Sequence, residues 1–179
     1  KAKADAEAKA SKTPQQTKAK SEKLIADPIV EKAVRWSLKK PEGELTEADL
    51  EKVTSLNLND TQITDAGLKE VAKLQKLEWL FLDRTKITDA GLKEVVKLQR
   101  LEGLDLDNTQ ITDEGLKEVV KIQKLTELIL IGTQITDEGL KEVVKLQKLK
   151  TLVLQDTKVT KAGVAQLKKA LPNCSIIGR

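Results

Sequence analysis

The chain of 179 residues is long enough for one domain or one repeat array, with 39% hydrophobic and 34% charged residues. It has no histidine and a single cysteine, Cys174, which excludes Ser-His-Asp and Cys-His catalysis, histidine metal ligands and an intramolecular disulfide. Because it contains no apolar run of about 18 residues, the sequence predicts no membrane insertion.

Residues 1–23 form a polar tail that carries the net charge of the chain. They hold seven lysines against three acidic residues, a net charge of +4 that equals the charge of the whole chain. Residues 24–179 are therefore neutral, which argues against a nucleic-acid partner, since such proteins present a basic face on a fold. The tail contains no Leu, Ile, Val or aromatic residue, so we expect disorder or a frayed helix, either as a spacer from an anchor or as a solubilising terminus. A spacer behind a removed signal or anchor would suit a secreted or cell-envelope protein, but the sequence leaves the compartment open.

Residues 24–53 are predicted to form a helical N-terminal cap. In DPIVEKAVRWSLKK (27–40), Asp27 is placed to cap a helix that begins at Pro28. Trp36 falls at the helical spacing of the apolar residues, so we expect it to pack rather than to bind a partner. Thr46, with Asp49 three residues later, predicts a capping box at the start of a second helix.

Residues 54–179 form an array of 24-residue units. The units align on recurring threonines: Thr61, Thr85, Thr109, Thr133 and Thr157. The unit LEWLFLDRTKITDAGLKEVVKLQR (77–100) begins with apolar residues at period 2, typical of a strand, and continues with apolar residues at period 3.6, typical of a helix that Thr88 or Asp89 can cap. One unit cannot bury its own apolar face, so we expect neighbouring units to stack.

The L-x-x-L-x-L core in successive units resembles the leucine-rich repeat family, and the T-x-I-T-D-A-G-L pattern and the ALPNC ending resemble its bacterial members in planctomycetes. The resemblance implies an α/β solenoid, a right-handed superhelix with parallel strands on the concave face, helices on the convex face and residues 24–53 as its cap. The family usually has Asn or Cys at the ninth position, where this chain has threonine, whose hydroxyl can bond loop backbone groups. Cys174 takes the place of a core leucine, so we expect a buried structural thiol.

The positions between the inward leucines vary from unit to unit, whereas the helix half is nearly copied. These varied positions point to the concave face in three columns. The columns are Ser55, Trp79, Gly103, Glu127 and Thr151; Asn57, Phe81, Asp105, Ile129 and Val153; and Asn59, Asp83, Asp107, Ile131 and Gln155.

A copied scaffold with a varied, partly apolar face is typical of a recognition surface. We expect Trp79 and Phe81 to anchor a partner, the carboxylates of Asp83, Asp105 and Asp107 to select a basic one, and other positions to extend the contact. These further positions are Glu127, Ile129, Ile131 and Val153. The carboxylates could instead pair with Arg84, hold Ca²⁺ or serve glycosidase chemistry, but neither a calcium-loop spacing nor a water-excluding pocket is indicated.

The sequence therefore predicts a non-enzymatic protein-protein interaction module that uses no cofactor or metal and binds a protein partner on its concave face. The alternative is a structural or self-assembling repeat element, natural or consensus-engineered. Its bare final strand, around residues 174–177, would then allow a weak dimer, and otherwise we expect a monomer.

Overall fold

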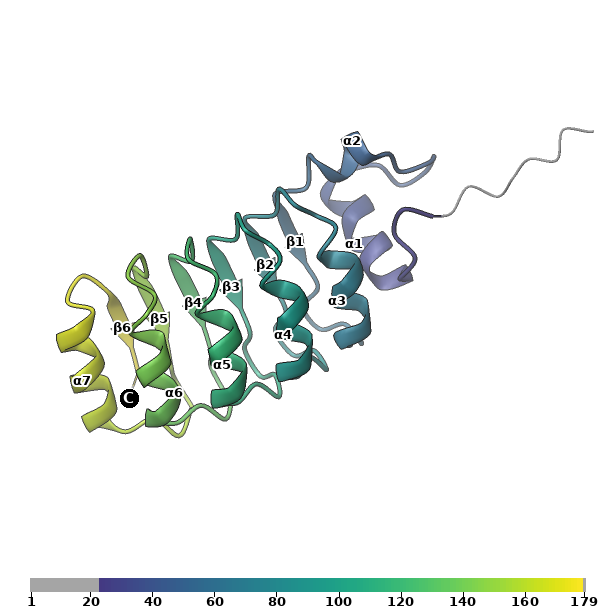
Figure 1. Cartoon of the computed structure of the whole chain (residues 1–179). Helices are drawn as coiled ribbons and strands as arrows, with labels where there is room; N and C mark the ends of the chain where they lie inside the picture. Colours follow the sequence, from purple (N-terminus) through teal and green to yellow (C-terminus); the bar gives the residue numbers. More distant parts are fainter. Residues whose placement is uncertain (1–22, 179) are drawn as a thin grey trace, which may run out of the picture.

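The computed structural model describes residues 23–178, so the predicted polar tail lies outside the described residues except for Lys23. Strands and helices alternate along a row of repeats (Figure 1). The strands are β1 (Ser55–Asn57), β2 (Trp79–Phe81), β3 (Gly103–Asp105), β4 (Glu127–Ile129), β5 (Thr151–Val153) and β6 (Ser175–Ile177). The helices are α1 (Pro28–Ser37), α2 (Glu47–Leu50), α3 (Asp65–Val71), α4 (Asp89–Val95), α5 (Asp113–Val119), α6 (Asp137–Val143) and α7 (Lys161–Ala170).

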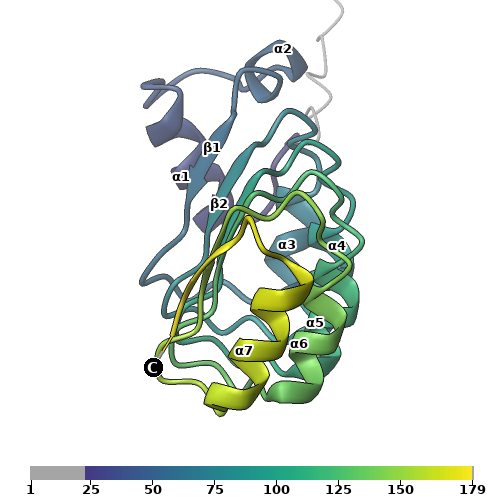
Figure 2. The ribbon, with the colours of Figure 1, turned by 90° about the vertical axis from the view of Figure 1, so that its left-hand side faces the viewer.

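The six strands form one parallel sheet in chain order. Each residue of a strand pairs with the residue 24 positions later, so that Leu56 lies beside Leu80 and Leu80 beside Leu104. Figure 2 shows this sheet along one side of the row and helices α3 to α7 along the other. The predicted α/β repeat solenoid is thus confirmed.

The core is aliphatic and lies between the sheet and the helices. The central strand residues Leu80, Leu104 and Leu128 are buried, as are Leu92 and Val95 from α4. The thiol of Cys174 is also buried, as predicted, and burial raises its pKa.

The cap helices begin where the sequence predicts. The Asp27 carboxylate accepts hydrogen bonds from the backbone N–H groups of Ile29 (2.8 Å) and Val30 (3.0 Å) at the start of α1. Thr46 and Asp49 form the predicted capping box of α2.

The prediction that Trp36 packs in the cap is wrong, because its side chain is 78% exposed. The buried side of α1 carries Val30 and Val34, four residues apart. One residue after Trp36, the Ser37 hydroxyl donates to the backbone carbonyl of Ser55 (3.0 Å) and so fixes α1 against β1. Trp36 lies on the other side of the helix, four residues after the exposed Lys32.

Successive repeats are joined by an aspartate at the start of each helix. The Asp89 carboxylate accepts hydrogen bonds from the backbone N–H (2.9 Å) and the hydroxyl (2.6 Å) of Thr112 in the next repeat. The same pair of bonds joins Asp65 to Thr88, Asp113 to Thr136 and Asp137 to Thr160. Each threonine in turn is the N-cap residue of its own helix. We call this series the Asp–Thr ladder.

The glycine three residues after each ladder threonine makes room for the aspartate that this threonine binds. A Cβ added at Gly115 would collide with the Asp89 carboxylate, and a Cβ at Gly139 would collide with the Asp113 carboxylate in the same way. The T-D-x-G pattern therefore joins three requirements: a helix cap, a carboxylate for the next repeat and space for the carboxylate of the preceding one.

The threonine at the ninth position of the repeat has a local function. Thr85, Thr109 and Thr133 are buried, and their hydroxyls donate to the carbonyl three residues earlier at 2.6–2.7 Å, which confirms the predicted bond to the loop backbone. The residue before each of these threonines has a positive φ. Asn108 and Gly132 accept this conformation easily, whereas Arg84 (φ 52°) is an unusual occupant.

We predict that Asp113→Ala destabilises the chain by about 1–3 kcal/mol, because the N–H and hydroxyl of Thr136 lose their shared acceptor. Urea unfolding followed by circular dichroism measures the change. The matched control is Glu114→Ala in the same helical turn, which removes only an exposed pair with Lys117 and should leave the stability almost unchanged. Equal stability of the two variants would contradict a structural role for the ladder.

Candidate binding face

The three predicted columns lie together on one surface, which we call the strand face. It consists of the residues that flank the central leucines of β1 to β5 and the residue two positions after each of these strands. The parallel register places equivalent residues of neighbouring repeats side by side. In β2, β4 and β5 the central leucine is buried and both flanking residues are half-buried. Each repeat contributes one rung, about 4.8 Å from the next.

Trp79 and Phe81 form a stacked pair on the second rung. Their ring centroids are 6.5 Å apart and their planes differ by 15°. The indole of Trp79 lies over Gly103 of the third rung, where a Cβ would collide with the ring. Gly103, which occupies the position of Trp79 in the next repeat, therefore leaves the space that the indole fills.

The three carboxylates occupy neighbouring rungs, but each has a partner within the chain. Asp83 forms an ion pair with Arg84 (2.9 Å). Asp105 accepts a hydrogen bond from the backbone N–H of Asp107 (3.0 Å), and Asp107 accepts one from the backbone N–H of Ile131 on the next rung (2.7 Å). One oxygen of Asp105 and one of Asp107 thus hold loop backbone, while the charge of each group remains on the strand face.

Sequence reasoning missed this second function of the third column. Asn59 accepts a hydrogen bond from the N–H of Asp83 (2.9 Å), as Asp107 does from that of Ile131 (2.7 Å). The available signal was the recurrence of Asn or Asp at 24-residue spacing in a column otherwise described as variable.

Burial changes the protonation of the acidic cluster. The pKa of Asp107 is raised to about 6, chiefly by desolvation and also by the nearby carboxylates of Asp105 and Asp83, against the lowering effect of the Ile131 N–H. Desolvation also raises the pKa of Asp105. The cluster therefore gains negative charge as the pH rises through the weakly acidic range.

The remaining predicted residues lie on the fourth and fifth rungs. Glu127 pairs in register with Gly103, and Ile129 lies between Asp105 and Val153. The side chains of Glu127, Ile129, Ile131 and Val153 are half-buried. Along the row, the strand face thus changes from aromatic to acidic to aliphatic.

Neither a metal-binding cluster nor a membrane-spanning helix is present within residues 23–178. These residues contain no group of three or more Cys, Asp or Glu side chains arranged to hold a metal ion. They also contain no helix with the length and apolar character needed to cross a membrane.

The repeated strand–helix unit, its 24-residue register and its row of buried leucines define a leucine-rich repeat solenoid. Three stretches of the chain, residues 50–72, 98–120 and 121–144, match the family model described as Leucine Rich repeat. A comparison with curated protein sequences finds no match.

Several solved bacterial structures are similar to the chain. An internalin, InlF, of Listeria monocytogenes is 21% identical with a TM-score of 0.63, over 87% of this chain and 51% of the internalin. A leucine-rich repeat protein of Leptospira interrogans is 27% identical with a TM-score of 0.52, over 72% of this chain and 38% of its own. Internalin C2 of Listeria monocytogenes is 23% identical with a TM-score of 0.47, over 86% and 83% of the two chains. The chain thus spans about half of the InlF chain and less of the Leptospira protein.

We predict that Asp107→Asn stabilises the protein near neutral pH and that this gain disappears on acidification. The folded pKa of Asp107, about 6, lies above the unfolded value of about 3.9. The wild-type carboxyl therefore contributes stability that is complete below the unfolded pKa and is lost as the pH rises through about 6. Asparagine stays neutral and can still accept the Ile131 N–H, so the Tm difference between the proteins should shrink between about pH 7.5 and 4.5.

Asp137→Asn is the matched control for this titration. The hydrogen bonds from Thr160 lower the pKa of Asp137, so its contribution is lost only as the pH falls below the unfolded value of about 3.9. Its Tm difference should stay constant over the same pH window. If the Tm difference of Asp107→Asn is also constant over this pH range, the pKa of Asp107 is not raised by folding.

Proposed function

We propose that this chain is a non-enzymatic protein-binding module whose strand face holds a basic partner segment. One observation carries the proposal: a scaffold copied from repeat to repeat presents a stacked aromatic pair directly beside a group of carboxylates. Aromatic side chains dominate the free energy of binding at many interfaces, and carboxylates select lysine or arginine. We further infer from the T-x-I-T-D-A-G-L pattern that the repeats are of the planctomycete type.

The mechanism of binding is rigid presentation. Trp79 is held by Phe81 on its own strand and by Gly103 beneath it. The backbone hydrogen bonds to Asp105 and Asp107 likewise restrict those carboxylates before a partner arrives. Side chains that are already ordered lose little conformational entropy on binding, so more of the contact energy contributes to affinity.

A partner that lies across the rungs would meet the three parts of the face in sequence. Its apolar side chains would cover Trp79 and Phe81, its basic groups would reach Asp105 and Asp107, and a second apolar group would reach Ile129. Ile131 and Val153 would extend that last contact, and Glu127 would add to the negative charge between the two apolar parts.

A second candidate function is self-association through the C-terminal strand. Strand β6 pairs with β5 along one edge, and Ile177 is 44% exposed. A strand of this kind can add to another chain. Light scattering of the binding samples described below separates the two functions, since a monomer at high concentration is not a self-assembling element.

We predict that Trp79→Ala combined with Phe81→Ala strongly weakens binding with little loss of stability, because neither side chain belongs to the buried leucine core. The probe is a displayed library of random peptides of about 12 residues, which in an extended conformation exceed the span of five rungs. Peptides enriched on the wild-type chain should be rich in Lys or Arg. Their Kd, measured by fluorescence anisotropy, should rise about 30-fold in the double variant, as expected for an aromatic anchor.

The control is Lys69→Ala with Lys93→Ala on the exposed side of α3 and α4, which should leave the Kd unchanged. Two results count against the proposal. One is equal peptide binding by the wild type and the Trp79 and Phe81 variant. The other is collapse of the fold in that variant, which would assign both rings to the core.

A further inference from the structure

The exposed Trp36 lines a groove formed by the solvent-facing side of α1, the loop that follows it and β1. The groove has a volume of about 800 Å³. Pro28, Trp36 and Pro41 supply apolar walls, and Ser55 and Asn57 of β1 close the end toward the sheet. Ser55 and Asn57 are also the first rung of the strand face. The groove is therefore continuous with the surface that carries the aromatic pair.

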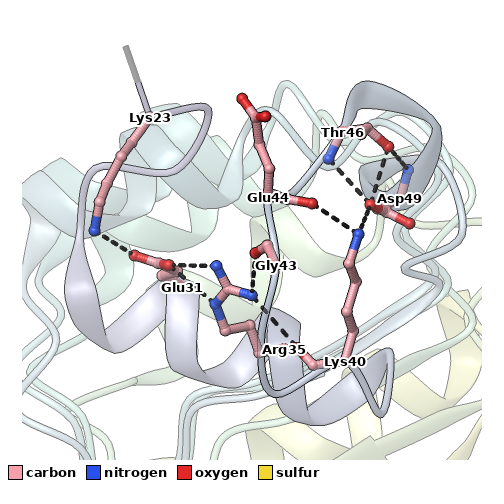
Figure 3. Close-up of polar contacts among 8 residues, drawn as sticks. All are labelled: Lys23, Glu31, Arg35, Lys40, Gly43, Glu44, Thr46 and Asp49. Carbon is pink, nitrogen blue, oxygen red and sulfur yellow. Dashed lines mark hydrogen bonds and ion pairs between the residues drawn. The ribbon is translucent and has the colours of Figure 1, made fainter. Parts of the chain in front are cut away.

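The wall of the groove is fixed by hydrogen bonds from two basic residues of the cap (Figure 3). The Arg35 guanidinium donates to the Glu31 carboxylate at 2.9–3.0 Å and to the carbonyl of Gly43 at 3.0 Å. The Lys40 ammonium donates to the carbonyl of Glu44 and to the Asp49 carboxylate, both at 2.7 Å. The loop that follows α1 is thus tied to both cap helices, and the groove exists before any ligand binds.

The charge that remains in the groove is positive. Glu31 and Arg35 compensate each other, and Lys23 adds a second ion pair to Glu31 (3.1 Å). Lys32 and Lys39 also line the groove, and neither has an ion-pair partner within the described part of the chain. A large exposed indole beside two uncompensated ammonium groups suits an apolar side chain next to an acidic one.

The register then fixes what lies beyond the groove. Ser55 pairs with Trp79 and Asn57 pairs with Phe81, so the groove opens directly onto the aromatic pair. Asp83, which is paired with Arg84, shares the rung of the aromatic pair, and Asp105 and Asp107 lie one rung further along. From the cap toward the C-terminus, the continuous surface is basic, then aromatic, then acidic.

We propose that the groove beside Trp36 binds the acidic end of the same extended protein segment whose basic residues reach Asp105 and Asp107. This inference rests on the proposed function and names the partner more closely, as a charge-segregated peptide segment with an apolar residue at its acidic end. A polyanion such as nucleic acid is the weaker candidate, because the carboxylates beyond the groove would repel its continuation along the face. A polypeptide can carry both charges in the required order.

The same random-peptide selection tests the inference with variants of the groove. Enriched peptides should contain an acidic residue near one end and basic residues near the other. Trp36→Ala should weaken their binding about tenfold without changing the Tm, since the side chain is exposed, and Trp36→Phe should restore most of the affinity. Lys32→Glu with Lys39→Glu should remove the preference for the acidic residue.

The matched control for the charge reversal is Lys69→Glu with Lys93→Glu, which changes the net charge equally on the helix side and should leave peptide selection unaltered. A single-stranded DNA oligonucleotide is the polyanion probe, and we expect it not to bind. Binding of the oligonucleotide in a Trp36-dependent manner would overturn the assignment of a peptide.

The remaining outcomes separate this inference from the proposed function. If peptides depend on Trp79 and Phe81 but not on Trp36, and carry no acidic end, the proposed function stands and the inference is wrong. If they depend on Trp36 and the two lysines but not on Trp79 and Phe81, the groove binds alone, and both the shared segment and the proposed function fail. A selection that enriches no peptide contradicts both.

Discussion

The Asp–Thr ladder is the constraint on which the rest of the structure depends. A single repeat has one short strand and one short helix, too little to bury its own leucines, so each repeat must be held against the next. The Asp89 carboxylate does this with two hydrogen bonds to Thr112, while Gly115 leaves the space for it. The bonds lie at the helix starts, so most side chains of the strand face are free of this task, although Asn59 and Asp107 also bind the backbone of the next repeat. The helix half of the repeat is therefore nearly copied, and the strand face can vary.

That division explains how a binding surface can arise on a regular scaffold. At the second and third rungs, the indole of Trp79 takes the space that a side chain at position 103 would occupy. The carboxylates of Asp105 and Asp107 are held by backbone N–H groups and by burial, which raises their pKa values. Both features place chemically demanding side chains on the face without disturbing the leucines beneath. At the cap, Arg35 and Lys40 fix the loop that follows α1, and the exposed Trp36 lines a groove with Pro41 of that loop.

Much of the fold could be predicted from the sequence because the repeat period is explicit. Leucines at period 2 and the T-D-x-G start of each helix indicate the strand, the helix and their alternation, and Asp27 and Thr46 mark the caps of α1 and α2. The exposure of Trp36 could not be predicted, because an apolar residue at helical spacing can lie inside or outside the buried side of a helix. The orientation of α1 depends on a tertiary contact, the hydrogen bond from the Ser37 hydroxyl to the carbonyl of Ser55. The backbone hydrogen bonds to Asp105 and Asp107 were also out of reach, since they join loop positions whose geometry arises only from stacking.

The most direct test of this account is native-state amide exchange, measured by NMR on the full chain, at the threonines that the ladder engages. We predict that the N–H groups of Thr112 and Thr136 exchange as slowly as that of Leu106, the residue after β3, which donates to the backbone carbonyl of Ile129. The backbone N–H of Thr64, the N-cap of α3, has no hydrogen-bond acceptor among the described residues and should exchange much faster. If Thr112 and Thr136 exchange as fast as Thr64 while Leu106 stays protected, the repeats are held by the sheet and core alone. The Asp–Thr ladder would then not be what keeps the strand face in register.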